Sequence, residues 1–246
     1  MTEHNQLLQE AVAAMNPGVT LTDAQIEQFA QYTRLLLEWN EKMNLTAITD
    51  ERDIVLKHYA DSLTALSVPA LDPLKPLRIA DIGTGAGFPG LPLQIAAPQW
   101  RVTLMDALQK RVKFLAHTTA ELGLDTVECL HLRAEDAGKS PNHREQYDAV
   151  ISRAVARLQV LAEYALPLVK QGGLFVALKG PAADEEIAAA ETAIFRLGGA
   201  KAEIQQVTIP FTDLQHKLVI IKKTRPTPKA YPRNAAQITK APLGSA

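Results

Sequence analysis

A glycine-rich stretch at residues 77–93, LRIADIGTGAGFPGLPL, constrains the fold of this chain more than any other feature. The apolar side chains before the glycines predict a short buried strand, and the residues from Phe88 onward predict the start of a helix. Between them, Gly83, Gly85 and Gly87 permit backbone angles and close approaches that a Cβ atom would prevent. A strand, a glycine turn and a helix in this order form a site that can hold a nucleoside cofactor.

The spacing of the glycines narrows the choice of cofactor. The dinucleotide fingerprint requires G-x-G-x-x-G, but the sixth position counted from Gly83 is Phe88. A phosphate-binding P-loop is excluded as well, because no Gly-Lys-Ser/Thr follows. The run is G-x-G-x-G, with Asp81 two residues before it. On its own, this glycine run is as compatible with a tight turn as with a cofactor site. The residues that follow the neighbouring strands are needed to distinguish the two.

Composition indicates a globular protein with a substantial core. The chain has 246 residues, 47% hydrophobic and 22% charged, which suffices for one large or two small domains. No apolar run approaches the roughly 20 residues of a membrane-spanning helix, and the N-terminus lacks signal-peptide features, so we expect a cytoplasmic protein without membrane partners. Cys129 is the single cysteine, which excludes an intrachain disulfide, and we expect no metal site.

Charge is distributed unevenly along the chain. The formal net charge is -1, but residues 214–246 contain seven Lys or Arg and no Asp or Glu. Residues 1–213 therefore carry 19 basic and 27 acidic side chains, a net charge of -8. The basic tail could meet a polyanion or could simply be solvated. Its basic residues are Lys217, Lys222, Lys223, Arg225, Lys229, Arg233 and Lys240.

Helical patterns dominate the N-terminal part. They cover residues 5–15, a segment that begins at Thr22 with a capping-box partner at Gln25, and residues 50–66. Three prolines then break the chain before the central strand. We therefore predict a helical N-terminal subdomain at residues 1–72, a cofactor-binding domain at 73–224 and a basic C-terminal tail at 225–246.

Strands and helices alternate from residue 77 onward. One helical pattern follows the first strand. Two others cover residues 110–122 and 182–196. This alternation predicts an α/β fold in which helices cover both faces of a mainly parallel sheet. The predicted strands are residues 77–82, 102–105, 127–132, 147–152, 174–178, 204–209 and 218–221.

The residues that follow these strands are candidates for ligand contact, because open α/β sheets bind ligands at the carboxyl ends of their strands. Asp106 follows the second strand and can accept hydrogen bonds from ribose hydroxyls; alternatively, it caps the helix that begins at residue 107. The residues after the third and fourth strands are Arg133, Ala134, Glu135, Ser152, Arg153 and Ala154.

An acidic residue followed by this glycine run resembles motif I of the class I S-adenosylmethionine-dependent methyltransferases. The segments MDALQKRVKFL, LRAED, YDAVISRAVA and ALKG, with WNEKMNLT, HYADSL and the closing YPR, make most of the chain similar to the RsmG (GidB) family, the bacterial 16S rRNA guanine-N7 methyltransferases. The resemblance implies a class I, Rossmann-like fold with a seven-stranded, mostly parallel sheet and a late antiparallel strand. It also implies S-adenosyl-L-methionine as cofactor and, as partner, 16S rRNA or a small ribosomal subunit particle, methylated in the 530-loop region.

The resemblance places Gly83, Phe88, Ala134, Glu135 and Arg153 on cofactor-contacting positions of the family. After YPR the family usually continues with a lysine and a glycine, whereas this chain has Asn-Ala-Ala; the departure concerns RNA binding by the tail, not the cofactor site. The complete predicted cofactor site comprises Asp81, Gly83, Gly85, Gly87, Phe88, Asp106, Ala134, Glu135 and Arg153.

The chain also constrains the acceptor atom. Methyltransferases of exocyclic amines carry an Asp/Asn-Pro-Pro-aromatic motif after the fourth strand, where this chain has SRAV, residues 152–155. Carbon-5 methylation of pyrimidines needs a cysteine nucleophile. The apolar sequence around Cys129 predicts that this cysteine is a buried hydrophobic residue within a strand, which disfavours that reaction. A guanine N7 already has an in-plane lone pair and no proton to lose. Alignment of the reacting atoms is then the main catalytic device, and no general base is expected.

The sequence leaves more than one role open for Arg153 and for His58. Arg153 could hold the carboxylate of the donor, the O6 edge of guanine or a phosphate, or could pair with Asp148 or Glu135. His58 is expected to be packed or exposed rather than catalytic.

Lys110, Arg111 and Lys113 form a basic helix face that could contact phosphates of an RNA substrate or could simply be solvated. Lys179 and Gly180, after the fifth strand, could line the substrate mouth or form a turn that approaches the next helix. The alternative functions are a regulatory or RNA-binding module that binds S-adenosylmethionine, and a methyltransferase acting on a small molecule or a protein.

Overall fold

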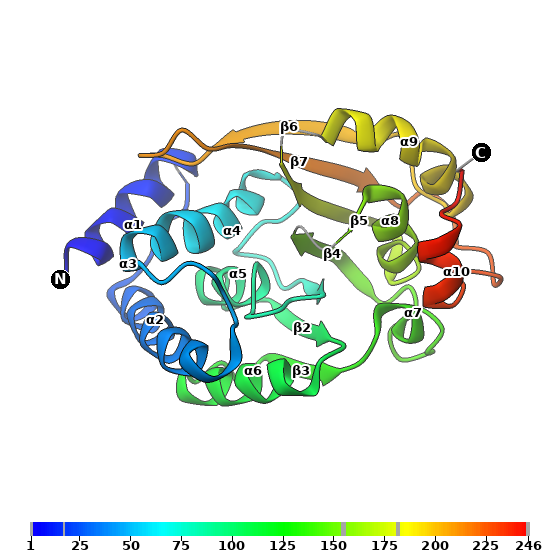
Figure 1. Cartoon of the computed structure of the whole chain (residues 1–246). Helices are drawn as coiled ribbons and strands as arrows, with labels where there is room; N and C mark the ends of the chain where they lie inside the picture. The colour runs from blue at the N-terminus through cyan, green and yellow to red at the C-terminus, as the bar shows by residue number, and fades with distance from the viewer. Residues whose placement is uncertain (1, 17, 154–155, 181–182, 245–246) are drawn as a thin grey trace.

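The computed structural model describes residues 2–16, 18–153, 156–180 and 183–244, and a seven-stranded sheet forms its centre (Figure 1). The strand order is β3-β2-β1-β4-β5-β7-β6; the first five strands along this order are parallel, and β7 is antiparallel to both of its neighbours. The predicted strands and the late antiparallel strand are thus confirmed. Their bounds are β1 Arg78–Ile82, β2 Arg101–Asp106, β3 Val127–His131, β4 Tyr147–Arg153, β5 Val169–Lys179, β6 Glu203–Thr208 and β7 Gln215–Lys222.

Strand β5 begins five residues earlier than predicted. Two glycines interrupt the apolar pattern of the strand before residue 174, and Gly172 has a φ of 87°, which favours glycine. A Cβ at Gly173 would lie 2.5 Å from the backbone oxygen of Asp148 on the neighbouring strand. The glycines therefore permit a bend and a close approach inside a long strand.

Alternating side chains of the sheet enter two separate cores. Ile79 and Ile151 belong to the first core, whereas Ala80 and Val150 belong to the second. Figure 1 shows the two helical layers on opposite sides of the sheet. Helices on the side of the first core are α1 Glu3–Met15, α2 Asp23–Met43, α5 Gly90–Ala96 and α6 Gln109–Glu121. Those on the other side are α7 Ala134–Ala137, α8 Leu158–Ala165, α9 Ala183–Arg196 and α10 Ala235–Lys240.

The N-terminal helices pack directly on the sheet. The capping box predicted at Thr22 is present, since its hydroxyl accepts from the Gln25 backbone N–H and the Gln25 side chain accepts from the Thr22 N–H. Helix α2 contributes Phe29 and Leu36 to the same core as Ile79 of β1. The region predicted as a helical subdomain thus shares its hydrophobic core with the sheet.

The helix predicted at residues 50–66 is present as a continuous helical segment that consists of four consecutive parts. A six-residue π-helix at its centre shifts the register of the side chains that follow. Its parts are α3 Glu51–Ile54, the π-helix Val55–Ala60, α4 Asp61–Leu63 and a 3₁₀ turn Thr64–Ser67. Short π-helical insertions are frequent at functional sites, and this one carries His58 and is followed directly by Asp61.

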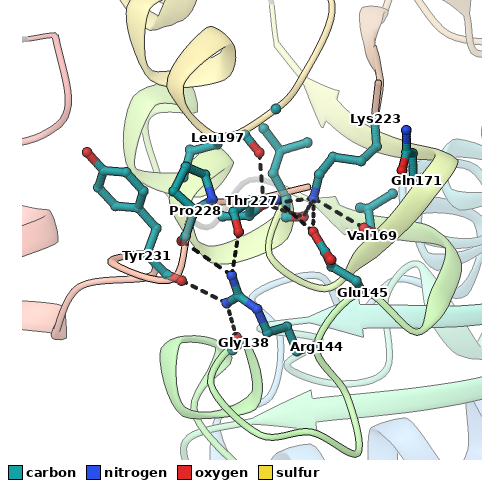
Figure 2. Close-up of polar contacts among 12 residues, drawn as sticks. Gly138, Arg144, Glu145, Val169, Gln171, Leu197, Lys223, Thr227, Pro228 and Tyr231 are labelled. Carbon is teal, nitrogen blue, oxygen red and sulfur yellow. Dashed lines mark hydrogen bonds and ion pairs between the residues drawn. The ribbon is translucent and has the colours of Figure 1, made fainter. Parts of the chain in front are cut away.

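The C-terminal segment is folded onto the second core instead of extending into solvent. Figure 2 shows the ammonium group of Lys223, which is fully buried and donates to Glu145, to Thr227 and to the carbonyl of Val169. It also donates to the carbonyl of Leu166 at 2.6 Å. Burial lowers the pKa of Lys223 to about 8, which the nearby Glu145 carboxylate partly opposes.

Two arginines complete the attachment. The Arg144 guanidinium donates to four backbone carbonyls, those of Gly138, Thr227, Pro228 and Tyr231 (Figure 2). Arg233 binds the carboxylate of Glu163, which is 0% exposed, with an Nη2 to Oε2 distance of 2.6 Å. The prediction that the basic tail could meet a polyanion is therefore wrong for Lys223 and Arg233, because both are occupied within the protein.

Candidate active site

The glycine turn lies where the order of the strands reverses. β1 pairs with β2 on one side and with β4 on the other, and the crevice at such a switch point is the usual ligand site of an open α/β sheet. Gly83, Gly85 and Gly87 have φ values of 67°, 64° and 101°, which favour glycine. A Cβ at Gly87 would lie 2.7 Å from the hydroxyl of Tyr32. Conformation therefore favours glycine at all three positions, and at Gly87 the space does as well.

Asp81 lies beneath this turn. Its Oδ2 accepts from the Thr84 hydroxyl at 2.6 Å and from the Gly90 N–H at 2.8 Å, so it joins the turn to the start of α5. Oδ1 has no hydrogen-bond partner among the described residues. Burial raises the pKa of Asp81 to about 6. The Asp81 side chain is fully buried, and its hydrogen bonds are to Thr84 and Gly90. A direct contact between Asp81 and the cofactor stays a prediction.

A cavity of about 190 Å³ opens beside the turn, at the carboxyl ends of β1 and β2. Four predicted residues line it: Gly83, Asp106, Ala134 and Glu135. The other five, Asp81, Gly85, Gly87, Phe88 and Arg153, are not among its lining residues. Arg133, a candidate because it follows the third strand, also lines the cavity. The wall further contains residues that the sequence did not indicate: Ile82, Met105, Ala107, Leu132, Ala156, Leu161 and Tyr164.

Asp106 connects the cavity to the turn. Its Oδ2 accepts from the Gly85 N–H at 3.0 Å and its Oδ1 from the Leu108 N–H at 2.8 Å, while Arg111 lies 3.4 Å from Oδ2. Helix α6 begins at Gln109 without a side-chain cap, so the capping alternative for Asp106 is wrong. A carboxylate offers about four acceptor positions, so this group can also accept hydrogen bonds from a bound ribose.

The remaining wall of the cavity combines one acid with an apolar surface. Glu135, on the short helix α7, is buried, and its Oε1 lies 3.9 Å from Nη1 of Arg133. Leu161 and Tyr164, which also line the cavity, come from α8. Burial raises the pKa of Tyr164, as do Glu135 and Glu163 nearby. The phenol therefore stays protonated, and the wall offers a flat apolar surface with a few polar groups, which suits a nucleobase.

Arg153 and Phe88 form a second cluster next to the turn. Arg153 Nη1 lies 3.0 Å from Asp61 Oδ2 and donates to the Lys57 carbonyl at 3.2 Å. Its guanidinium carbon lies 4.9 Å from the centre of the Phe88 ring. The predicted alternative, a pair with Asp148 or Glu135, is wrong: Arg153 binds Asp61, and Asp148 forms an ion pair with Lys170.

His58 belongs to the same cluster. Its ring stacks on Phe88 with 4.4 Å between the centroids, and its Nδ1 lies 3.3 Å from Arg153 Nη2. Arginine cannot accept a hydrogen bond, so Nδ1 is the acceptor and Nε2 carries the proton donated to the Thr46 hydroxyl at 2.8 Å. Burial and then the charge of Arg153 lower the pKa of His58 to about 4. His58 is therefore a neutral, packed side chain, as predicted.

Lys179 and Cys129 lie on strands of the sheet and are at least partly buried. Lys179 is buried and donates to the Ala156 carbonyl at 2.5 Å and to Glu186 at 2.8 Å, so its ammonium group is engaged within the protein, and a place at the substrate mouth stays a prediction. Cys129 is partly buried within β3, and burial raises its pKa, in agreement with a packing role.

Lys110 and Lys113 are exposed on α6, whereas Arg111 contacts Asp106. Ala154 and Val155 lie outside the described residues. Among the described residues, no group of three or more His, Cys, Asp or Glu could hold a metal ion, and no helix is long and apolar enough to cross a membrane.

Sequence comparisons agree with this geometry. Residues 25–217 match the GidB family model, described as rRNA small subunit methyltransferase G. The chain is 47% identical over 241 residues to the ribosomal RNA small subunit methyltransferase G of Alkaliphilus oremlandii (strain OhILAs), covering 98% of this chain and 99% of that protein. It is 49% identical over 232 residues to the protein of the same name from Clostridium novyi (strain NT), covering 94% and 95%.

A solved structure with the same fold is a variant of the 16S rRNA (adenine(1408)-N(1))-methyltransferase from Catenulisporales acidiphilia. It superposes with a TM-score of 0.52 over 65% of this chain and 90% of that one, at 15% sequence identity. At this identity the likeness concerns the fold alone.

Proposed function

The chain belongs to the rRNA small subunit methyltransferase G (GidB) family, and we propose that it transfers a methyl group from S-adenosyl-L-methionine to N7 of a guanine in the 530-loop region of 16S rRNA. Its fold is that of the class I methyltransferases. The observation that carries the proposal is the cavity at the switch point, where a glycine turn, an acceptor carboxylate and an apolar wall meet. An rRNA substrate implies that the protein acts in the cytoplasm.

The residues around the cavity fit the donor. A Cβ at Gly85 would meet no atom within 4 Å, so the turn has open space beside it for a ligand. Asp106 would accept from the ribose hydroxyls with the lone pairs that Gly85 and Leu108 leave free. Met105, Leu132 and Leu161 would enclose the adenine ring. The ribose and the adenine ring of the donor would thus each meet a surface of matching chemistry.

Methyl transfer to N7 needs little chemistry from the protein. The donor supplies a sulfonium methyl group: the bond between N7 and carbon forms as the bond between carbon and sulfur breaks, and its electron pair stays on sulfur. The guanine gains a positive charge but loses no proton. His58 is neutral and uses Nδ1 to accept from Arg153, so it does not act as a base. The residues contribute by alignment, which can be worth about 7–11 kcal/mol.

The test is transfer of a labelled methyl group onto ribosomal RNA from cells that lack this protein. Naked 16S rRNA and intact small subunits would be compared as substrates, followed by chemical cleavage at N7-methylguanine. We expect label in the small-subunit RNA and a single cleavage in the 530-loop region. An unlabelled small-subunit RNA, from protein shown by calorimetry to bind the donor, would refute the proposal.

A further inference from the structure

The turn between β6 and β7 extends past the edge of the sheet at which the donor cavity opens. β7 is antiparallel to β5, and its third residue pairs with the last residue of β5. Because β5 is parallel to β4, residues 209–214 project beyond the carboxyl ends of the parallel strands (Figure 1). At the start of β7, Nδ1 of His216 lies 2.6 Å from Oδ1 of Asp61, whose Oδ2 binds Arg153. The β6–β7 turn is thus joined to the cluster beside the glycine turn.

One aromatic side chain is strongly exposed at the β6–β7 turn. Phe211 is 54% exposed and has a φ of 63°, in the left-handed region that Gly, Asn and Asp occupy more readily than a bulky residue. Single exposed hydrophobic residues are common, so exposure alone carries no argument. Among the five large hydrophobic residues that are strongly exposed in the described ranges, however, only Phe211 has a positive φ. Backbone of this kind is concentrated at functional sites.

Hydrogen bonds close the backbone around Phe211, and both ends of the turn are anchored in the core. The Thr212 hydroxyl donates to the Ile209 carbonyl at 2.8 Å and accepts from the Leu214 N–H at 3.0 Å. The Ile209 N–H donates to the Leu214 carbonyl at 3.2 Å. Ile209 is buried in the first core, and Leu214 packs against that core. The aromatic ring is therefore presented to solvent by an ordered backbone, and an ordered side chain loses little conformational entropy when it binds a ligand.

We propose that Phe211 stacks on an unpaired base of the rRNA beside the methylated guanine. The inference rests on the function proposed above, because that function brings RNA to this edge of the sheet. Sequence-specific recognition of RNA takes place mainly where bases are unpaired, and such bases stack on aromatic side chains. The contact with RNA explains why a strained phenylalanine occupies a position that Gly or Asn would occupy without strain.

The composition of the turn favours a base over a phosphate or a protein partner. Residues 209–215 contain no Lys or Arg, and Asp213 is acidic, so the turn cannot neutralise phosphates. Pro210 and Thr212 beside Phe211 are half-buried, so the ring is the main apolar surface that the turn offers. One ring matches the face of one base, whereas a stable protein interface needs about 800 Å² on each partner.

The experiment measures methyl transfer at varied concentrations of small subunits from cells that lack the protein. Phe211→Asn removes the ring and supplies a residue that tolerates the left-handed conformation. We expect the KM for the subunit to rise about 5- to 150-fold, the usual effect of removing one stack between an aromatic ring and a base, with kcat and donor affinity unchanged. In urea unfolding the variant should be at least as stable as the wild type, because the strain is relieved. An unchanged KM, or a loss of stability, overturns the inference.

Two further variants separate the ring from its position. Phe211→Tyr keeps an aromatic ring and should retain the wild-type KM. Phe195→Ala is the matched control, because Phe195 is 66% exposed near the end of α9, at the opposite edge of the sheet, where Gly199 pairs with Lys223. It should also leave the KM unchanged. The inference fails if Phe211→Tyr is as impaired as Phe211→Asn, or if Phe195→Ala raises the KM equally.

Photo-cross-linking distinguishes RNA from protein as the partner. With p-benzoylphenylalanine in place of Phe211, we expect a cross-link to an unpaired nucleotide of the 530-loop region in the bound subunit. A cross-link to a ribosomal protein instead of rRNA contradicts the inference.

The two proposals fail in different ways. Wild-type protein that does not methylate guanine N7 refutes the proposed function, and the inference with it. An active wild type whose KM is unaffected by Phe211→Asn refutes the inference alone.

Discussion

Replacing Arg233 by alanine tests how firmly the C-terminal segment is attached. Glu163 is 0% exposed and accepts from the Arg233 backbone N–H at 2.9 Å and from its guanidinium at 2.6–3.2 Å. Arg233→Ala leaves the charge of Glu163 buried, with the backbone N–H as its remaining partner among the described residues. Breaking a buried ion pair from one side in this way costs about 3–5 kcal/mol, so we expect a loss of that size.

The assay is urea unfolding at pH 7, followed by circular dichroism. Glu163→Gln should cost less than Arg233→Ala, because it removes the buried charge and leaves Arg233, whose side chain is 22% exposed, able to reach water. Lys229→Ala is the control: Lys229 is exposed, and substitutions at such sites usually change stability by less than about 0.5 kcal/mol. The reasoning is refuted if Arg233→Ala is no more destabilising than Lys229→Ala, or if Glu163→Gln is the worse of the two.

Three further predictions concern the active site. Asp106→Asn should weaken donor binding by about 1.5–3 kcal/mol, since it loses charge-assisted hydrogen bonds; calorimetry showing unchanged affinity would contradict this. Tyr32→Phe removes the 2.5 Å hydrogen bond to the buried Ala86 carbonyl of the glycine turn and should cost about 1–3 kcal/mol in urea unfolding, with weaker donor binding. Because the pKa of His58 is lowered to about 4, the unfolded chain binds its proton first as pH falls. The contribution of His58 to stability should therefore fall by about 1.4 kcal/mol per unit from pH 6.5 to 4 and then level off, while Asp81, whose pKa is raised to about 6, contributes in the opposite direction. The difference between wild type and His58→Gln, measured by unfolding across that range, isolates the His58 contribution.

The sheet and the glycine turn were predictable because their signals are local. A strand of apolar residues followed by Gly83 specifies its own geometry, and parallel strands bring their carboxyl ends to one edge wherever they lie in the sequence. The positions of Asp106 and Glu135 after their strands therefore suffice to predict that they lie at this edge, where both line the cavity. The apolar wall was missed, since Leu161 and Tyr164 belong to a helix whose position over that edge depends on tertiary packing alone.

The partners of the charged residues could not be predicted for a related reason. Asp61 lies 92 residues before Arg153 in the chain, and nothing near Arg153 indicates which helix covers the end of its strand. A periodic reading of the segment would also misplace Asp61, because the π-helix rotates the side chains that follow it. Lys223 was misjudged because lysine is usually exposed, and its burial depends on carbonyls and on Glu145 from distant segments.

Phe88 connects the N-terminal helices to the glycine turn. It occupies the position where a dinucleotide-binding turn would need its third glycine, so the same residue that excludes a pyrophosphate also supplies an aromatic surface. His58 stacks on that ring and Arg153 lies over it, while Tyr32 of α2 contacts it with 5.6 Å between ring centres. The cofactor turn ends where this aromatic cluster begins. A shift of α2 or of the π-helix would therefore move the glycine turn and the Arg153 guanidinium together.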